Sequence, residues 1–248
     1  MTIEAGARFG IIAPDDLVFN YLYGRPFAPQ HAQWDQALIR WRDLYSDPGC
    51  TWHREVELDL GELAPMVTWG TSPEAALPIT GSIPNPLDEP NLTLRQSMKD
   101  ALSYMALAPG TPLNSIKIDR VFIGSCTNAR LADLRSAAEI FKGTRSKVPG
   151  IVVPGSIDVK RAAEQEGLDL IFKQAGLEWR EPGCSMCVGI NGDTAPAGER
   201  IASTSNRNFV GRQGPGVKTH LMSPAMAAAA AVTGHLTDVR TLQDRISR

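Results

Sequence analysis

The chain lacks the large net charge typical of nucleic-acid-binding proteins and the long apolar runs typical of membrane proteins. Its 25 lysines and arginines nearly balance 27 acidic residues. The resulting net charge of −2 gives no broad attraction to nucleic acid or to an anionic membrane. The longest apolar run, residues 225–232, is far shorter than the roughly 20 residues needed to cross a bilayer. We therefore expect no nucleic-acid or membrane partner.

Cysteine is also scarce, with four in 248 residues, and no basic segment followed by an apolar core marks a signal peptide. Cysteines without secretory features favour metal or cluster ligation over disulfides, and they indicate a reducing compartment such as the cytoplasm. The share of hydrophobic residues, 43%, is that of an ordinary folded protein. At this length the chain forms one large domain or two smaller ones.

Three of the cysteines lie in two short glycine-containing loops. Cys126 follows Gly-Ser, and Cys184 and Cys187 form a C-x2-C pair after Pro-Gly. Three thiolates are an odd number for disulfides and one ligand short of a usual structural zinc site. They suit an iron–sulfur cluster whose fourth iron stays open to substrate as a Lewis acid. Cys50, in a separate Pro-Gly turn, is interpreted as a bystander.

Two other interpretations of the cysteines remain open on spacing alone. The C-x2-C pair is also typical of a zinc half-site or a redox dithiol, with Cys126 as a buried core thiol. Against zinc, no histidine lies near either loop in the sequence. Against a thioredoxin-like site, no clear helix opens after Cys184.

Composition divides the chain near residues 78–93, a stretch without hydrophobic periodicity that is typical of a linker. We therefore expect domains at 1–80 and 81–248. The first contains an amphipathic helix at 34–45. The second alternates strand and helix, which predicts an α/β fold with a parallel sheet and helices on both faces. Its expected elements are strands at 116–123, 150–154, 200–204 and 220–222, and helices at 129–141 (capped by Asn128), 156–167, 168–175 and 225–232.

Polar loops follow two of these strands. Cys126 comes directly after strand 116–123, and Asn206 and Arg207 follow strand 200–204. Because ligand sites of open α/β sheets gather beyond the carboxyl ends of the strands, we expect both loops at one rim. Arg207 and Arg212, with amides and hydroxyls beside them, are suited to binding carboxylates. The alternative is a pair of solvated surface arginines. No phosphate-binding P-loop occurs.

The chain resembles the aconitase superfamily through three motifs in the same order. These motifs are G-S-C-T-N-A-R, P-G-C-S-M-C and S-T-S-N-R-N-F-V-G-R-Q-G-P-G, followed by T-H-L-M-S-P. Within the superfamily the chain is most similar to the large subunits of bacterial 3-isopropylmalate dehydratases. The resemblance implies an aconitase-like α/β domain at 81–248. Residues 1–80 would be the C-terminal part of an incomplete α/β domain.

The resemblance also implies roles for individual residues. Cys126, Cys184 and Cys187 would hold three irons of a [4Fe–4S] cluster. Glu4, which by itself is an ordinary solvated charge, would hydrogen-bond the iron-bound water or hydroxyl as a catalytic acid. The implied substrate-binding residues are Asn206, Arg207 and Arg212.

The implied activity is a hydro-lyase that isomerises 2- and 3-isopropylmalate in leucine biosynthesis, in a heterodimer with a separate small subunit. Homoaconitase or a citramalate-type isomerase is the near alternative. The Asp-His and His-containing motifs of the family's N-terminal region do not occur in this chain. We therefore expect it to be the C-terminal portion of a large subunit and inactive in isolation, or else a non-catalytic cluster-binding fragment that needs a missing half.

Overall fold

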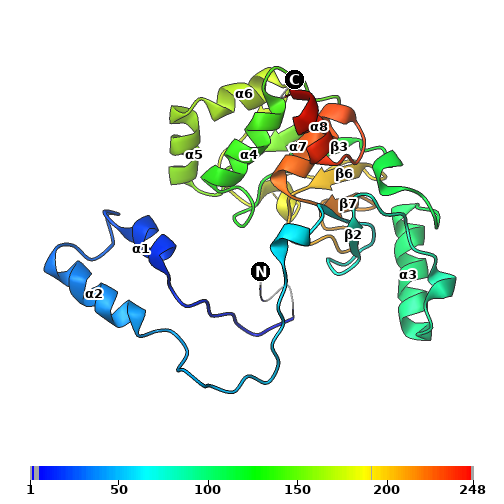
Figure 1. Ribbon diagram of the computed structural model, residues 1–248. Helices are drawn as coiled ribbons and strands as arrows, with labels where there is room; N and C mark the ends of the chain where they lie inside the picture. Colours follow the sequence, from blue (N-terminus) through cyan, green and yellow to red (C-terminus); the bar gives the residue numbers. More distant parts are fainter. Residues whose placement is uncertain (1, 3–5, 191, 247–248) are drawn as a thin grey trace. The chain divides into compact units, whose positions relative to one another are not determined.

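The structure is a computed structural model that describes residues 2, 6–190 and 192–246, and it divides the chain into two compact units, Met1–Glu62 and Leu63–Arg248 (Figure 1). The two units meet between residues 62 and 63, whereas composition indicated a boundary at residue 80. Residues 66–78 belong to the second unit because they pair as a hairpin that is hydrogen-bonded to it, with Leu221 N donating to Thr68 Oγ1 at 2.7 Å.

The first unit consists of helix α1 (Asp16–Leu22), helix α2 (Ala32–Arg42) and the 3-10 turn η1 (Leu60–Glu62). The Trp41 ring contacts two buried rings, with its centroid 6.0 Å from that of Phe19 and 5.6 Å from that of Trp34. The helix predicted at 34–45 is therefore present, although it begins and ends earlier. Residues 6–62 contain no strand, and the strands of the segment 1–80 for which an α/β character is expected lie at 66–68 and 76–78.

A five-stranded parallel sheet forms the centre of the second unit, in the order β5-β4-β3-β6-β7. Its strands are β3 (Arg120–Ile123), β4 (Gly150–Val152), β5 (Glu178–Trp179), β6 (Arg200–Ser203) and β7 (Lys218–Leu221). A separate antiparallel hairpin joins β1 (Met66–Thr68) to β2 (Ala76–Pro78). The α/β class and the parallel sheet are confirmed.

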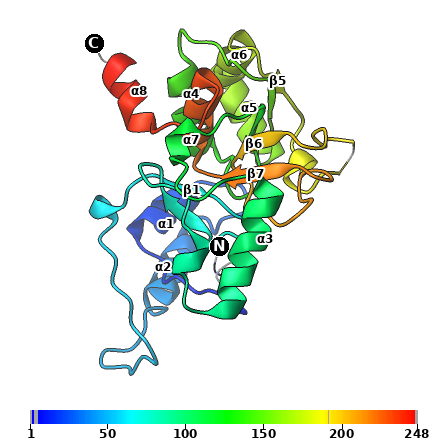
Figure 2. The same ribbon diagram turned by 90° about the vertical axis from the view of Figure 1, so that its right-hand side faces the viewer.

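The two faces of the sheet are covered differently. On one face Val121 and Ile123 of β3 pack in the larger apolar core with the helices, and Figures 1 and 2 show α4 beside α7. On the other face Phe122 and Ile201 pack against a 3-10 turn and loop residues between Met186 and Val217. The helices are α3 (Leu92–Met105), α4 (Leu131–Phe141), α5 (Ile157–Gln165), α6 (Leu168–Gln174), α7 (Pro224–Thr233) and α8 (Val239–Ile246), with 3-10 turns η2 (Pro86–Asp88), η3 (Leu113–Ser115) and η4 (Ser185–Cys187). Within the described ranges no helix is long and apolar enough to cross a membrane.

Local capping signals place several helices correctly and one incorrectly. Ser223 Oγ accepts from Met226 N at the start of α7, and Gly234 ends that helix with φ 82°. The cap predicted at Asn128 is wrong, because α4 begins at Leu131 and Asp133 Oδ2 accepts from Arg130 N at 3.0 Å. Helix α3 was not predicted, and its first two residues fall within the expected linker.

His220 is fully buried in β7 between two polar partners. Its Nδ1 lies 2.6 Å from Thr68 O, and its Nε2 lies 2.8 Å from Arg200 Nη1. A neutral imidazole that carries its proton on Nδ1 satisfies both contacts. Burial, together with the charge of Arg200, lowers the pKa of His220 to about 3, against a smaller opposing effect of the Thr68 carbonyl.

This lowered pKa predicts a specific loss of stability in acid. Below pH 6.5 the unfolded chain takes up a proton at His220 that the folded chain does not, so this contribution to the free energy of unfolding falls by about 1.4 kcal/mol per pH unit until about pH 3. The contribution is fully present above pH 6.5. His220→Asn should therefore reduce the slope of stability against pH in urea unfolding series from pH 7 to 4. His53→Asn, at an exposed imidazole, is the control, and equal slopes in wild type and His220→Asn would contradict the assignment.

Candidate functional site

The order of the strands places a candidate ligand site at the carboxyl ends of β3 and β6. From β3 the chain moves outward to β4 and β5, and it then returns to β6 on the other side of β3. The loops after β3 and β6 therefore leave neighbouring parallel strands at the point where the strand order reverses. In open α/β sheets this switch point, beyond the carboxyl ends of the strands, is where ligands bind.

Hydrogen bonds join these two loops directly. Gly124 N donates to Thr204 Oγ1 at 2.8 Å, and the same hydroxyl lies 2.8 Å from Gly124 O, to which it donates. Asn128 Nδ2 donates to Thr204 O at 2.7 Å, which explains why this side chain does not cap α4. The Cys126 loop is thus held against the segment that carries Asn206, as the strand pattern predicted.

The third loop brings Cys187 to the same segment. The Cys187 side chain is buried, and its Sγ lies 3.3 Å from Ser205 Oγ. The same sulfur lies 3.8 Å from Asn206 Oδ1 and 3.8 Å from Arg212 Nη2. Residues 187 and 205–212, which are distant in the sequence, therefore form one cluster of a thiol, an amide and a guanidinium group.

Arg212 is the half-buried cation of this cluster. Its guanidinium carbon lies 5.2 Å from the centre of the Phe209 ring. Its Nε is buried and has no hydrogen-bond partner among the described residues. A buried N–H of a charged group is costly to leave unpaired, so this atom is suited to an anionic acceptor. Arg207 lies exposed on the same loop.

A buried polar layer supports the loop from beneath. Ser203 Oγ accepts from Gln213 Nε2 and from Ser205 N, both at 3.1 Å. Gln213 Oε1 accepts from Thr219 Oγ1 at 2.9 Å. We did not predict the role of Gln213. The sequence feature that could have revealed this role is the density of amide and hydroxyl residues around the arginines, since polar groups in a buried segment must hydrogen-bond to one another.

The three cysteines predicted to bind the cluster do not have the geometry of a preformed metal site. Cys126 and Cys184 are exposed, Cys187 is buried, and none forms a disulfide. No group of three or more His, Cys, Asp or Glu residues in the described part of the chain is placed to hold a metal ion. Glu4 lies outside the described residues.

The chemistry of the donor set nevertheless fits a thiolate-bound cluster. Three cysteine thiols, which are soft sulfur donors, come from two loops at one rim, and the unpaired Nε of Arg212 belongs to a guanidinium group that contacts one of the sulfurs. Hydrogen bonds to ligand sulfurs are a usual feature of such centres.

The sequence pattern of the aconitase family (aconitate hydratase) matches residues 1–234. The chain belongs to the aconitase family. This aconitase-family chain is 55% identical over 246 residues to 3-isopropylmalate dehydratase large subunit 1 of Bradyrhizobium diazoefficiens, which covers 98% of this chain and 51% of the relative. The chain thus spans about half the length of the curated relative it matches. The crystal structure of Thermococcus kodakaraensis aconitase X in its holo-form aligns with 52% of this chain and 28% of that protein, with a TM-score of 0.31 and 19% identity.

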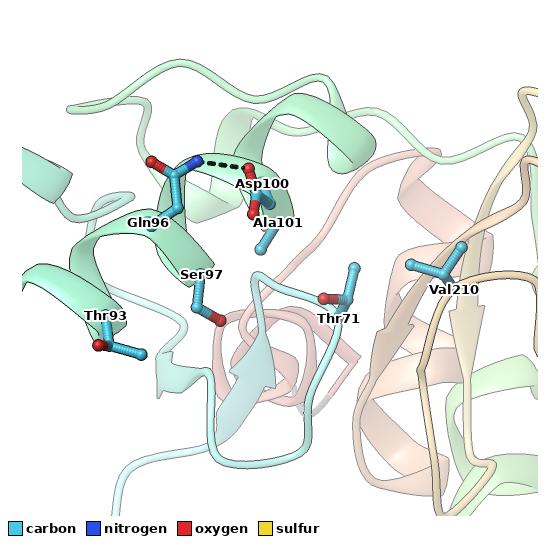
Figure 3. Close-up of a pocket in the computed structure, with 7 residues that line it drawn as sticks. All are labelled: Thr71, Thr93, Gln96, Ser97, Asp100, Ala101 and Val210. Carbon is cyan, nitrogen blue, oxygen red and sulfur yellow. Dashed lines mark hydrogen bonds between the residues drawn. The ribbon is translucent and has the colours of Figure 1, made fainter.

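A hollow lies beside the loop that carries Arg212, between α3 and Val210 (Figure 3). It has a volume of about 540 Å³, and Gln96 Nε2 donates to Asp100 Oδ1 at 2.8 Å within it. Its lining contains a carboxylate and no lysine or arginine, so it is unsuited to a dicarboxylate substrate. The lining residues are Thr71, Thr93, Gln96, Ser97, Asp100, Ala101 and Val210.

Proposed function

We propose that this chain supplies the cluster-binding and substrate-binding part of a 3-isopropylmalate dehydratase. The reaction is a dehydration and rehydration that exchanges a hydroxyl group between adjacent carbons of 2- and 3-isopropylmalate, within leucine biosynthesis. One observation carries the proposal: Cys187 Sγ lies within 3.8 Å of polar side-chain atoms of both Asn206 and Arg212, at the switch point of the sheet. The identity of 55% to a large subunit supports this choice of substrate.

Cys126, Cys184 and Cys187 are the residues that would hold a [4Fe–4S] cluster. When bound, the cluster would supply a Lewis-acidic iron that favours departure of the substrate hydroxyl without a net redox change. Three cysteines from two loops, none of which forms a disulfide, support this assignment. A cytoplasmic location, where thiols stay reduced, follows as part of the proposal.

The remaining residues are proposed to bind and orient the substrate. Arg212 would pair its buried Nε–H with a substrate carboxylate, and the exposed Arg207 would bind a second carboxylate oxygen. Asn206, held beside Cys187, would hydrogen-bond the substrate. Glu4 would hold a proton for the departing hydroxyl group.

The complete enzyme is proposed to contain more protein than this chain. The relative is named a large subunit, which supports a small-subunit partner, and the chain spans about half of that relative. A second candidate function is a cluster-binding module without activity of its own. An aconitase-like division at 1–80 and 81–248 remains part of the proposal.

Reconstitution tests the proposed function. The chain, treated anaerobically with iron and sulfide, is assayed with 3-isopropylmalate alone and after addition of the remaining large-subunit segment and the small subunit. We expect an oxygen-sensitive cluster, little turnover by the chain alone and clear turnover by the complete set, because catalytic groups that act as a unit lose most of the rate when one is absent. Homocitrate and citramalate should react more slowly. Robust turnover by the isolated chain would contradict the proposal that the other protein parts are needed. No turnover by the complete set would contradict the proposed dehydratase function.

A further inference from the structure

We infer that Tyr104, in the last turn of α3, is a positioning residue that fixes the loop carrying Arg212; the inference rests on the proposed function of that arginine. The Tyr104 hydroxyl accepts a hydrogen bond from Gly211 N at 3.1 Å and donates one to Val217 O at 2.7 Å. A single side chain thus spans the loop from the residue before Arg212 to the residue before β7. Its two hydrogen bonds therefore hold Gly211 and Val217, the two ends of this part of the loop, to the same side chain of α3.

The end of α3 that carries Tyr104 is itself fixed to the sheet. Arg200 Nη2 donates to Met105 O at 2.7 Å, and Arg200 Nη1 contacts His220 as described above. Carbonyls in the last turn of a helix have no partner within the helix, and a cationic donor there also interacts favourably with the helix dipole. The anchor of the loop is therefore connected to β6 and β7 through a partly buried network.

The loop has a second anchor on the other side of Arg212. Asn208 is buried, and its Nδ2 donates to Gly70 O at 2.6 Å in the turn between β1 and β2. Between the two anchors, Val210 lines the hollow that also borders α3 (Figure 3). Since Val210 is 58% exposed, apolar packing does not hold this stretch. The placement of Arg212 thus depends on its own turn bond from Arg212 N to Phe209 O at 3.0 Å and on the hydrogen bonds at Asn208, Tyr104 and Gln213.

Tyr104→Phe keeps the ring and removes only the hydroxyl that makes both bonds. A neutral hydrogen bond contributes modestly, so we expect kcat/KM for 3-isopropylmalate to fall about three- to tenfold, mainly through KM. The cluster should assemble as in wild type, because Tyr104 is not a ligand. Tyr45→Phe, the same change at an exposed tyrosine, is the matched control and should have no effect.

Hydrogen exchange on the 248-residue chain tests the contact without cluster or substrate. In Tyr104→Phe the Gly211 amide loses its acceptor, so its exchange should become about tenfold faster, while the amides of β3 and β6 keep wild-type protection. Unchanged exchange at Gly211 would overturn the inference. Faster exchange throughout the sheet would also overturn it, because it would show a general loss of stability.

A double-mutant cycle tests whether Tyr104 acts through Arg212. In a complete two-subunit enzyme, Tyr104→Phe should lower kcat/KM in the wild-type background and have almost no further effect in the Arg212→Lys background. Additive effects would overturn the inference and leave the proposed function intact. If the wild-type enzyme itself does not turn over 3-isopropylmalate, the proposed function fails, while the exchange experiment still decides whether Tyr104 holds the loop.

Discussion

Each of the single substitutions Cys126→Ser, Cys184→Ser and Cys187→Ser should abolish the visible charge-transfer absorbance of the reconstituted chain and remove most of its acid-labile sulfide. Each thiolate is proposed to bind a different iron, and a serine hydroxyl is a poor ligand because it is harder than a thiolate and far less acidic. With three protein ligands in total, the loss of one leaves two, too few to retain the cluster. We expect this to be the largest effect of any single substitution in the chain.

Cys50→Ser provides the matched control, since Cys50, like the other three cysteines, forms no disulfide but lies in the first unit. It should reconstitute like wild type. Absorbance, iron and sulfide are measured together on all four variants. Stoichiometric zinc without acid-labile sulfide in the wild-type chain would overturn the cluster assignment and favour the structural zinc interpretation.

Arg212→Lys should lower kcat/KM in a complete enzyme by about one to two decades, although the positive charge is retained. Lysine cannot make a two-pronged contact with a planar carboxylate, and loss of a charge-assisted hydrogen bond removes roughly 1.5–3 kcal/mol. The Nε of Arg212, buried and unpaired among the described residues, is the atom that lysine lacks altogether. Arg207→Lys should act in the same direction.

Arg161→Lys is the control for this pair, because the Arg161 side chain is 72% exposed on α5. It should leave kcat/KM unchanged. Cluster absorbance should be normal in all three variants, since no arginine is a ligand. Wild-type kinetics in both Arg207→Lys and Arg212→Lys would show that these residues are solvated surface groups.

Where the information is local, the sequence predicts this chain well. Helix α7 begins at Pro224 after its cap Ser223 and is ended by Gly234, and α5 begins after Ser156, whose hydroxyl accepts from Val159 N at 3.2 Å. The signals for these boundaries act over three or four residues. Short apolar runs likewise predict the buried strands, and residue type with spacing selects the candidate cysteines and arginines.

Errors arise where distant groups compete with local ones. Asn128 has the side chain of a helix cap, but the Thr204 carbonyl, 76 residues away, binds its amide instead. Helix α3 was hidden by the proline-rich stretch before it, although Asn91 Oδ1 caps it by accepting from Thr93 N and Leu94 N. In the first case a distant partner decided the outcome, and in the second the composition of the preceding stretch outweighed a local cap.

The sequence by itself determined the family, the parallel α/β class, and the types of residue available for ligation and carboxylate binding. Tertiary structure alone decided which of them meet. The strand order β4-β3-β6 brings the loops after β3 and β6 together, and packing on one sheet face places Cys187 against Ser205 and Arg212. It also decided the surroundings of Tyr104 and His220, because hydrogen bonding and burial depend on neighbours that are remote along the chain.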